Sequence, residues 1–249
     1  MAEIARYACT SLPGLNSANK LKPDATGYYK CILGGFNMSN HSGVNYPLLP
    51  SVKALFGEGG IVRRRLDAGL CKGEYGHPKL DGMALNDILK RLAFIDPLLT
   101  SHHIKSIELQ NQKDTNGKEL VLAVGMVKPS GPYGQYLAEQ LNNPEENVAF
   151  SIRSFTRDIV HNGLAAKQVV DAMTYDFVTE PGISKATKFN TVSLEELHET
   201  ILFTDRDLTN AIATSSVAGL EATSDTLTMV KTALGWNQVR VTHLSALNW

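Results

Sequence analysis

Hydrophobic and polar residues alternate along several stretches of the chain, and this two-residue period is typical of β-strands. In NVAFSIRS (147–154), valine, phenylalanine and isoleucine fall on one side of an extended chain, whereas Ser151 and Arg153 fall on the other. Further strands are predicted at 27–36, 60–76 (one or two strands), 103–110, 118–127 and 168–181. The Asn116-Gly117 pair between two of these strands is a strong hairpin signal.

Three segments are predicted to be helices: 83–94, 133–143 and 192–213. The first and the third repeat leucine and isoleucine at the spacing of an amphipathic helix. The third is the strongest of them, because Ser193 and Glu196 fit a capping box ahead of its apolar stripe.

The composition changes after this last helix. The segment ATSSVAGLEATSDT (213–226) is small, polar and nearly devoid of large apolar residues, which is typical of a flexible linker. Apolar residues return in the final stretch, and the sequence contains no internal repeat. We therefore predict one α+β domain over 1–212, a flexible linker over 213–226 and a C-terminal extension over 227–249.

Charge and cysteine content narrow the class of protein. The 249 residues include 24 basic and 25 acidic side chains, so there is no basic footprint for nucleic acid, and the arginine run at 63–65 is interpreted as a solvated face. Three widely spaced cysteines without a CxxC pair indicate free thiols in the cytoplasm. No apolar run reaches about 18 residues, and Glu3 and Arg6 interrupt the N-terminal stretch. We expect a soluble protein that binds neither nucleic acid nor membrane.

Among the histidines, His77 is the strongest candidate for a catalytic base. Gly76 and Pro78 hold it in a tight bend directly after a predicted strand, although an exposed turn histidine explains this tripeptide equally well. His102 and His103 begin a strand, where alternation sends the two rings to opposite faces and prevents them from sharing a metal. Neither HxH nor HExxH spacing occurs, so we expect no metal and no cofactor.

Ser151 is the candidate nucleophile. The sequence has no GxSxG elbow, so a nucleophilic serine here would not be of the α/β-hydrolase kind. Ser154 is the alternative, but it would face the opposite side of a regular strand. Arg153 shares the face of Ser151, where it either stabilises an oxyanion or binds an acidic substrate side chain, or is an ordinary surface arginine.

Four runs, taken in their order and spacing, carry a resemblance to a known family. They are GEYGHPKL (73–80), SHHIKSIEL (101–109), the stretch from NGKEL to AFSIRS (116–154) and TYDFVTEP (174–181). Together they resemble the prohead maturation proteases of large tailed phages, in particular giant phages of the phiKZ type. These enzymes are relatives of herpesvirus assemblin, a serine protease fold distinct from chymotrypsin and subtilisin. The resemblance covers roughly residues 60 to 185.

The resemblance implies a catalytic triad. It places the general base at His77, in a Glu-x-x-His-Pro element, and the nucleophile at Ser151. The third member in assemblin is a histidine 25 positions after the serine, and that position here is Asp176. An aspartate can accept the Nδ1 proton of His77 and stabilise the imidazolium. Many phage relatives have two adjacent serines followed by Arg-Gly, whereas this chain reads Ser-Ile-Arg-Ser at 151–154, which keeps Ser154 open as an alternative.

The resemblance also implies an α+β fold with a mostly antiparallel, barrel-like β-sheet surrounded by helices, as in assemblin. The implied activity is a serine endopeptidase that cleaves scaffold and major capsid proteins inside the phage prohead, in the host cytoplasm. The relatives form dimers, so we expect a homodimer, with the helix at 192–213 as a candidate contact. The alternatives are an inactive structural or scaffold protein of the prohead, and an unrelated α+β hydrolase or binding module.

Phage relatives cut after glutamate in motifs that resemble a small residue, any residue and then Glu. Motifs of this kind end at Glu108, Glu195 and Glu221. The first lies in a predicted strand and the second in the first turn of a predicted helix, where cleavage requires local unfolding. The third lies in the predicted linker. We therefore predict self-cleavage between Glu221 and Ala222, which would release residues 222–249; a linker with a chance glutamate is the alternative.

Overall fold

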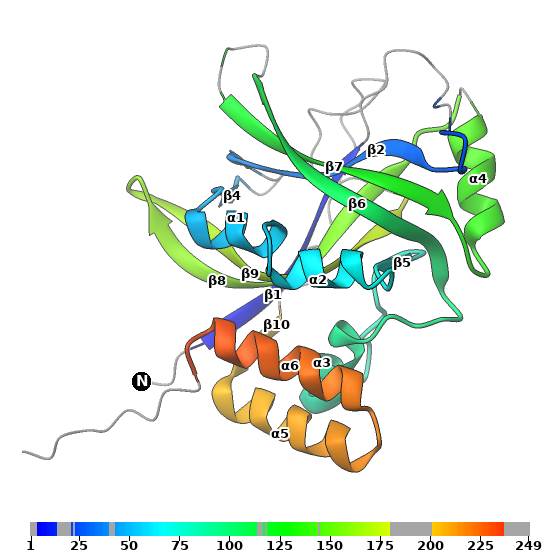
Figure 1. The fold of residues 1–249 in the computed structure, drawn as a ribbon. Helices are drawn as coiled ribbons and strands as arrows, with labels where there is room; N and C mark the ends of the chain where they lie inside the picture. Colours follow the sequence, from blue (N-terminus) through cyan, green and yellow to red (C-terminus); the bar gives the residue numbers. More distant parts are fainter. Residues whose placement is uncertain are drawn as a thin grey trace, which may run out of the picture.

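The computed structural model describes residues 4–13, 21, 23–39, 43–113, 117, 119–143, 145–179 and 201–236, with the backbone alone for 4–13 and 201. The described strands form a six-stranded and a four-stranded sheet (Figure 1). The first has the order β10 (Ile201–Thr204), β1 (Ile4–Pro13), β8 (Ala149–His161), β9 (Leu164–Val178), β4 (Asn45–Tyr46) and β3 (Met38–Ser39). The second has the order β2 (Tyr29–Phe36), β7 (Glu119–Pro129), β6 (Thr100–Lys113) and β5 (Lys72–Glu74). Within these sheets only the short β4–β9 pairing is parallel.

The two longest strand pairings, β8 with β9 and β6 with β7, are hairpins. Asn162 and Gly163 have φ angles of 53° and 78° between β8 and β9, which is the left-handed backbone of a two-residue hairpin turn. Gly117, with φ of 77°, lies in the longer connection between β6 and β7, where the sequence predicts a hairpin. Asn116 lies outside the described residues.

Strands β8 and β9 are covered on both faces. On one face, Phe150, Ile152 and Phe177 belong to a core between the two sheets. On the other face, Phe155 packs edge to face on Phe203, with ring centroids 5.6 Å apart, in a second core beneath the helices. Because both faces are covered, residues 149–156 are all buried, and polar side chains there have to find partners inside the protein.

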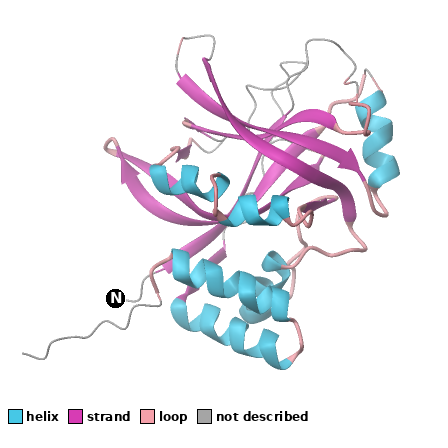
Figure 2. Cartoon of the chain, in the orientation of Figure 1, coloured by secondary structure: helices cyan, strands magenta, loops and turns pink. Residues whose placement is uncertain are grey.

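The helices lie in separate places around the sheets, and Figure 2 shows one group on the lower side of the molecule. That group consists of α3 (Leu85–Ala93), α5 (Asp205–Val217) and α6 (Glu221–Ala233). The others are α1 (Pro50–Phe56), α2 (Ile61–Asp67) and α4 (Gly134–Asn142). Within the described part of the chain, no helix combines the length and the apolar character needed to span a membrane.

The expected α+β class and the antiparallel sheets are confirmed, but the described strands do not close into the expected barrel. The two sheets meet at one isolated parallel bridge, between Tyr75 and Phe177. Strand β5 is only three residues long, so its pairing ends before a continuous ladder to β9 can form. The barrel-like closure is therefore wrong for the described strands, and the likeness to assemblin stays an expectation from the resemblance.

The prediction of strands over 60–76 is wrong for its first half, which forms helix α2. Val62 and Leu66 are both buried, whereas Arg64 between them is exposed; in a strand all three would share one face, so this burial pattern is helical. The arginine run is on this helix. Arg63 is exposed and pairs with Asp67, as expected for a solvated face, whereas Arg65 reaches a buried carboxylate, Asp171.

The helix expected at 192–213 begins later. The carboxylate of Asp207 accepts hydrogen bonds from the backbone N–H and the hydroxyl of Thr204, at 2.8 and 2.7 Å, and so caps α5. Residues 201–204 form strand β10, and the expected cap at Ser193 and Glu196 lies outside the described residues.

The sequence predicts a flexible linker at 213–226, but the structure has two helices there. This stretch contains the end of α5, a turn at 218–220 and the first half of α6. Small residues such as Ser215 and Ser224 are buried where the two helices pack, and Leu227 and Val230 of α6 are fully buried in the second core. The small polar composition therefore reflects close helix packing rather than flexibility. Residues 237–249 of the expected C-terminal extension lie outside the described residues.

Candidate active site

The bend that carries His77 is fixed at the point where the two sheets meet. The backbone N–H of Gly76 donates to the carbonyl of Phe177 at 2.7 Å, and Tyr75 bridges the same residue. Gly76 has a φ of 75°, a backbone conformation that favours glycine. The side chain of His77 is 32% exposed, so it lies at the solvent edge of this junction.

Asp176 lies directly behind His77 and is fully buried. Its Oδ2 is 3.4 Å from Nδ1 of His77, and its Oδ1 accepts the backbone N–H of Glu74 at 3.0 Å. Nε and Nη2 of Arg153 each donate to this carboxylate at 2.9 Å. Burial by itself would raise the pKa of Asp176, but the charge of Arg153 and the hydrogen bond from His77 lower it to about 2. The carboxylate is therefore held ionised.

Ser151 lies opposite Asp176 in the β8–β9 register, which places the two side chains on the same face of the sheet. Its side chain is 1% exposed, and its Oγ has no hydrogen-bond partner among the described residues. A buried hydroxyl without a partner is unusual, because leaving one unsatisfied costs about 1–3 kcal/mol. The structure thus brings Ser151, Asp176 and the bend of His77 to one region.

Ser154 lies on the other face of β8. It is buried like Ser151, but it is three positions further along the strand and shares the face of Ile152, toward the core between the sheets. Ser151 instead shares the face of Arg153 and Phe155. This placement favours Ser151 over Ser154 as the partner of Asp176.

Arg153 differs from both interpretations made from the sequence. It is fully buried, so the surface interpretation is wrong. Its guanidinium contacts the carboxylates of Asp176 and Glu74 and the carbonyl of Phe94, so it is directed at internal anions rather than at an oxyanion or a substrate. Its observed role is to compensate the buried charge of Asp176.

The sequence did not identify the carboxylate of Glu74 as part of this region. Glu74 is fully buried at the end of β5 and takes part in the ion pairs of Arg153. The two residues are 79 positions apart, so no local pattern connects them. Two signals were available: the glutamate of the Glu-x-x-His-Pro element, to which no role was assigned, and an arginine within a strand of otherwise apolar and small residues, which indicates a buried anion nearby.

His102 and His103 lie in different environments, as strand alternation predicts. His102 is fully buried, with Nδ1 2.8 Å from Oγ of Ser101, and burial lowers its pKa to about 4. His103 lies near the surface against Tyr28. Over the ranges that the structure describes, no three histidine, cysteine, aspartate or glutamate side chains gather in a way that could hold a metal ion.

The described cysteines are unpaired, as the sequence predicts. Cys31 and Cys71 are both free and buried, and burial raises the pKa of their thiols to about 12 and about 11. Neither thiol is therefore a nucleophile at neutral pH.

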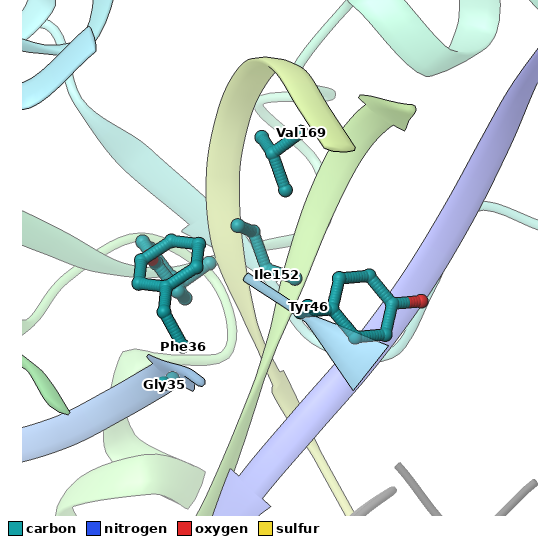
Figure 3. A pocket seen from close by; sticks show the side chains of 7 residues that line it. Gly35, Phe36, Tyr46, Ile152 and Val169 are labelled. Carbon is teal, nitrogen blue, oxygen red and sulfur yellow. The ribbon is translucent and has the colours of Figure 1, made fainter. Parts of the chain in front are cut away.

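A small apolar cavity lies on the opposite side of β8 from Ser151 (Figure 3). It is lined by Gly34, Gly35, Phe36, Tyr46, Ile152, Val169 and Tyr175. Ile152 and Tyr175 belong to the core between the sheets. This cavity is therefore a packing feature of that core rather than part of the site around His77.

Comparison with known proteins decides the family. The Peptidase S80 family matches residues 7–232, which include His77, Ser151 and Asp176. The chain belongs to the Peptidase S80 family. This S80 chain is 31% identical over 242 residues to the capsid maturation protease of Pseudomonas phage phiKZ, covering 93% of this chain and 88% of that protein. The resemblance to phage prohead proteases is therefore confirmed.

A solved structure shows a weaker similarity to this S80 chain. The capsid assembly protease of bacteriophage T4 matches with a TM-score of 0.45 and 14% sequence identity, over 71% of this chain and 98% of that one. Similarity at this level does not inform the site.

Proposed function

We propose that this chain is a serine endopeptidase that cleaves scaffold and capsid proteins during phage head maturation. Membership of a peptidase family and the similarity to a capsid maturation protease support the coarse function. The observation that carries the mechanism is the contact between Nδ1 of His77 and the buried carboxylate of Asp176, with Ser151 opposite that carboxylate. The proposed triad is Ser151, His77 and Asp176.

In this mechanism each residue has one task. The carboxylate of Asp176 accepts a hydrogen bond from Nδ1–H of His77, and this fixes the tautomer in which Nε2 of the neutral ring is free to take the hydroxyl proton of Ser151. The serine oxygen then attacks the peptide carbonyl, and the imidazolium returns the proton to the leaving amine. Because Arg153 holds Asp176 ionised, the carboxylate stabilises the imidazolium at every step.

Substrate access is part of the proposal. Ser151 is 1% exposed, whereas the side chain of His77 is 32% exposed, so the approach to the site is from the side of His77. A substrate peptide has to displace whatever covers Ser151 before its carbonyl can reach Oγ. We infer that the described conformation is a resting one.

The test is covalent labelling with a peptidyl phosphonate, followed by peptide mapping. We expect the label on Ser151, no label and no cleavage in Ser151→Ala, and normal labelling in the matched control Ser154→Ala. Replacing a triad serine typically removes several orders of magnitude of rate. Cleavage at the wild-type rate by Ser151→Ala would reject this nucleophile, and absence of labelling and cleavage in the wild type would favour an inactive prohead protein.

The finer properties of the enzyme are also proposals. We infer cleavage after glutamate in small-x-Glu motifs, action inside the prohead in the host cytoplasm, and self-association as a homodimer. Self-cleavage between Glu221 and Ala222 belongs to the same set. The structure places this bond at an exposed position in the first turn of α6, so cutting requires that turn to unwind.

A further inference from the structure

A chain of buried charges extends from Asp176 away from His77. Arg153 contacts Glu74 as well as Asp176, with its Nη2 3.1 Å from Oε2 of Glu74. Glu74 in turn accepts two hydrogen bonds from Arg91 of α3, at 3.0 and 2.6 Å, and a third from the backbone N–H of Asp96, at 2.6 Å. Starting from the imidazole, the order of charges is therefore negative, positive, negative, positive.

The buried charges in this chain sum to zero. Two carboxylates (Asp176 and Glu74) face two guanidiniums (Arg153 and Arg91), and all but Arg91 are fully buried. The side chain of Arg91 is 15% exposed and forms the outer end. Removing any one member leaves a net charge close to the imidazole in a medium that screens poorly, and such a charge changes the free energy of the imidazolium.

We propose that Glu74 and Arg91 are positioning residues that set the basicity of His77 by dividing the charge of Arg153 between two carboxylates. This inference rests on the proposed function, because it takes His77 to be the catalytic base. With Glu74 present, Arg153 is shared, and Asp176 keeps enough negative charge to stabilise the imidazolium. Arg91 neutralises Glu74, so the cluster carries no excess negative charge.

The charged and titratable groups around the imidazole come from several elements. They are Asp176 of β9, Arg153 of β8, Glu74 of β5, Arg91 of α3, His102 of β6, and Lys79 and Asp81 of the loop that follows His77. Burial keeps His102 neutral at physiological pH, so it adds no charge. Lys79 and Asp81 are exposed, and water screens them. The four-member chain is therefore the main buried source of field at His77.

The two ends of the chain predict shifts of opposite sign. Glu74→Gln leaves an excess positive charge, so the pKa of His77 should fall. Arg91→Gln leaves an excess negative charge, so the pKa of His77 should rise. We expect about one pH unit in each direction, as for one elementary charge near a partly buried imidazole. Arg91→Lys keeps the charge and should stay near the wild-type value.

The measurement is NMR titration of the His77 imidazole in a Ser151→Ala background, with its resonance assigned by its absence in His77→Gln. This background prevents self-digestion and does not depend on activity. In the Ser151 enzyme, the acid limb of the pH dependence of kcat/KM should move in the same directions. A role limited to stability would lower the unfolding midpoint without these opposite shifts.

Arg65→Gln is the matched control. Arg65 is 21% exposed and donates two hydrogen bonds, at 3.1 and 3.0 Å, to the fully buried carboxylate of Asp171, so its pairing resembles that of Arg91 and Glu74. Asp171 lies five positions before Asp176 on β9, about 16 Å away along the strand. The control should lose a comparable amount of stability and leave the pKa of His77 unchanged.

The outcomes separate this inference from the proposed function. Shifts of the same sign, no shift, or an equal shift in Arg65→Gln would overturn the inference. If the pKa of His77 shifts in opposite directions in Glu74→Gln and Arg91→Gln but Ser151→Ala still cleaves substrate, the role of the charge network is supported and the serine mechanism is rejected. If Glu74→Gln does not fold, the comparison of Arg91→Gln with Arg91→Lys decides alone, because Arg91 lies at the partly exposed end.

Discussion

Replacing Arg153 by methionine should destabilise the protein strongly. Methionine has a similar length but removes two hydrogen bonds of 2.9 Å to Asp176, one of 3.3 Å to Glu74 and one of 3.1 Å to the carbonyl of Phe94. Removing one partner of a buried ion pair typically costs 3–5 kcal/mol, because the remaining charge stays buried without compensation. We therefore expect Arg153→Met to lower the free energy of unfolding by about 4 kcal/mol at pH 7.

Urea unfolding followed by circular dichroism would measure this loss, which should lower the midpoint by roughly 1–2 M. The matched control is Arg157→Met, since Arg157 lies on the same strand but bonds to Gln168 at 3.0 Å in a half-buried position. That control should lose less than about 1 kcal/mol.

The pH dependence gives a second check on Arg153. The folded-state pKa of Asp176 is about 2, below its ordinary value of 3.8, so its contribution to stability is present above pH 4 and lost as the pH falls toward 2. Without Arg153 the pKa of Asp176 should rise, and protonation should relieve the buried charge. The difference between variant and wild type should therefore shrink from pH 7 to pH 4. A variant with wild-type stability and no activity would refute this reasoning and restore a direct role at the oxyanion.

The remaining predictions address the triad, acid stability, metals and self-cleavage. Asp176→Asn should reduce kcat/KM strongly yet leave residual cleavage above that of Ser151→Ala in a peptide assay, since orienting the base is only part of catalysis; equal rates in the two variants would contradict this. Burial lowers the pKa of His102 from 6.5 to about 4, so the stability that the neutral ring contributes is present above pH 6.5 and is lost between pH 6.5 and 4, by up to about 3 kcal/mol. In urea titrations, a His102→Gln variant should not show this loss of stability between pH 6.5 and 4. Since the sequence has no metal-ligand spacing, EDTA should leave cleavage unchanged, and inhibition that zinc reverses would reveal a missed site. A cut after Glu221 should appear by intact mass and disappear in Glu221→Gln, but the fragment should stay bound until denaturant is added, because α6 packs in the second core.

Local patterns predicted elements whose packing follows a simple period. The hairpin of β6 and β7, and helix α3, appear where alternation and leucine spacing place them. Helix α2 was misassigned because a short run with three arginines fits a strand and a helix about equally well. The deciding contacts of its buried valine and leucine with the core are tertiary.

The α5–α6 hairpin shows a different limit. Its alanines, serines and threonines resemble a linker by composition, yet they allow two helices to pack closely. At the site, the sequence and the resemblance named His77, Ser151 and Asp176, which the structure brings to one region. They could not place Arg153 inside the protein, because its partner Glu74 is 79 positions away and only the folded chain joins them.

The junction of the two sheets has a consequence for when this chain becomes active. His77 follows β5 of one sheet, whereas Ser151 and Asp176 belong to the other, and the contact between His77 and Asp176 joins residues 99 positions apart. In the proposed mechanism, neither half of the chain contains all three triad residues, so we expect a growing or partly folded chain to be unable to cut itself or its neighbours. Contacts between residues so far apart in sequence are slow to form, because the entropy of closing the loop between them has to be paid first. Activity should therefore return only with the slowest step of refolding, after most secondary structure has formed.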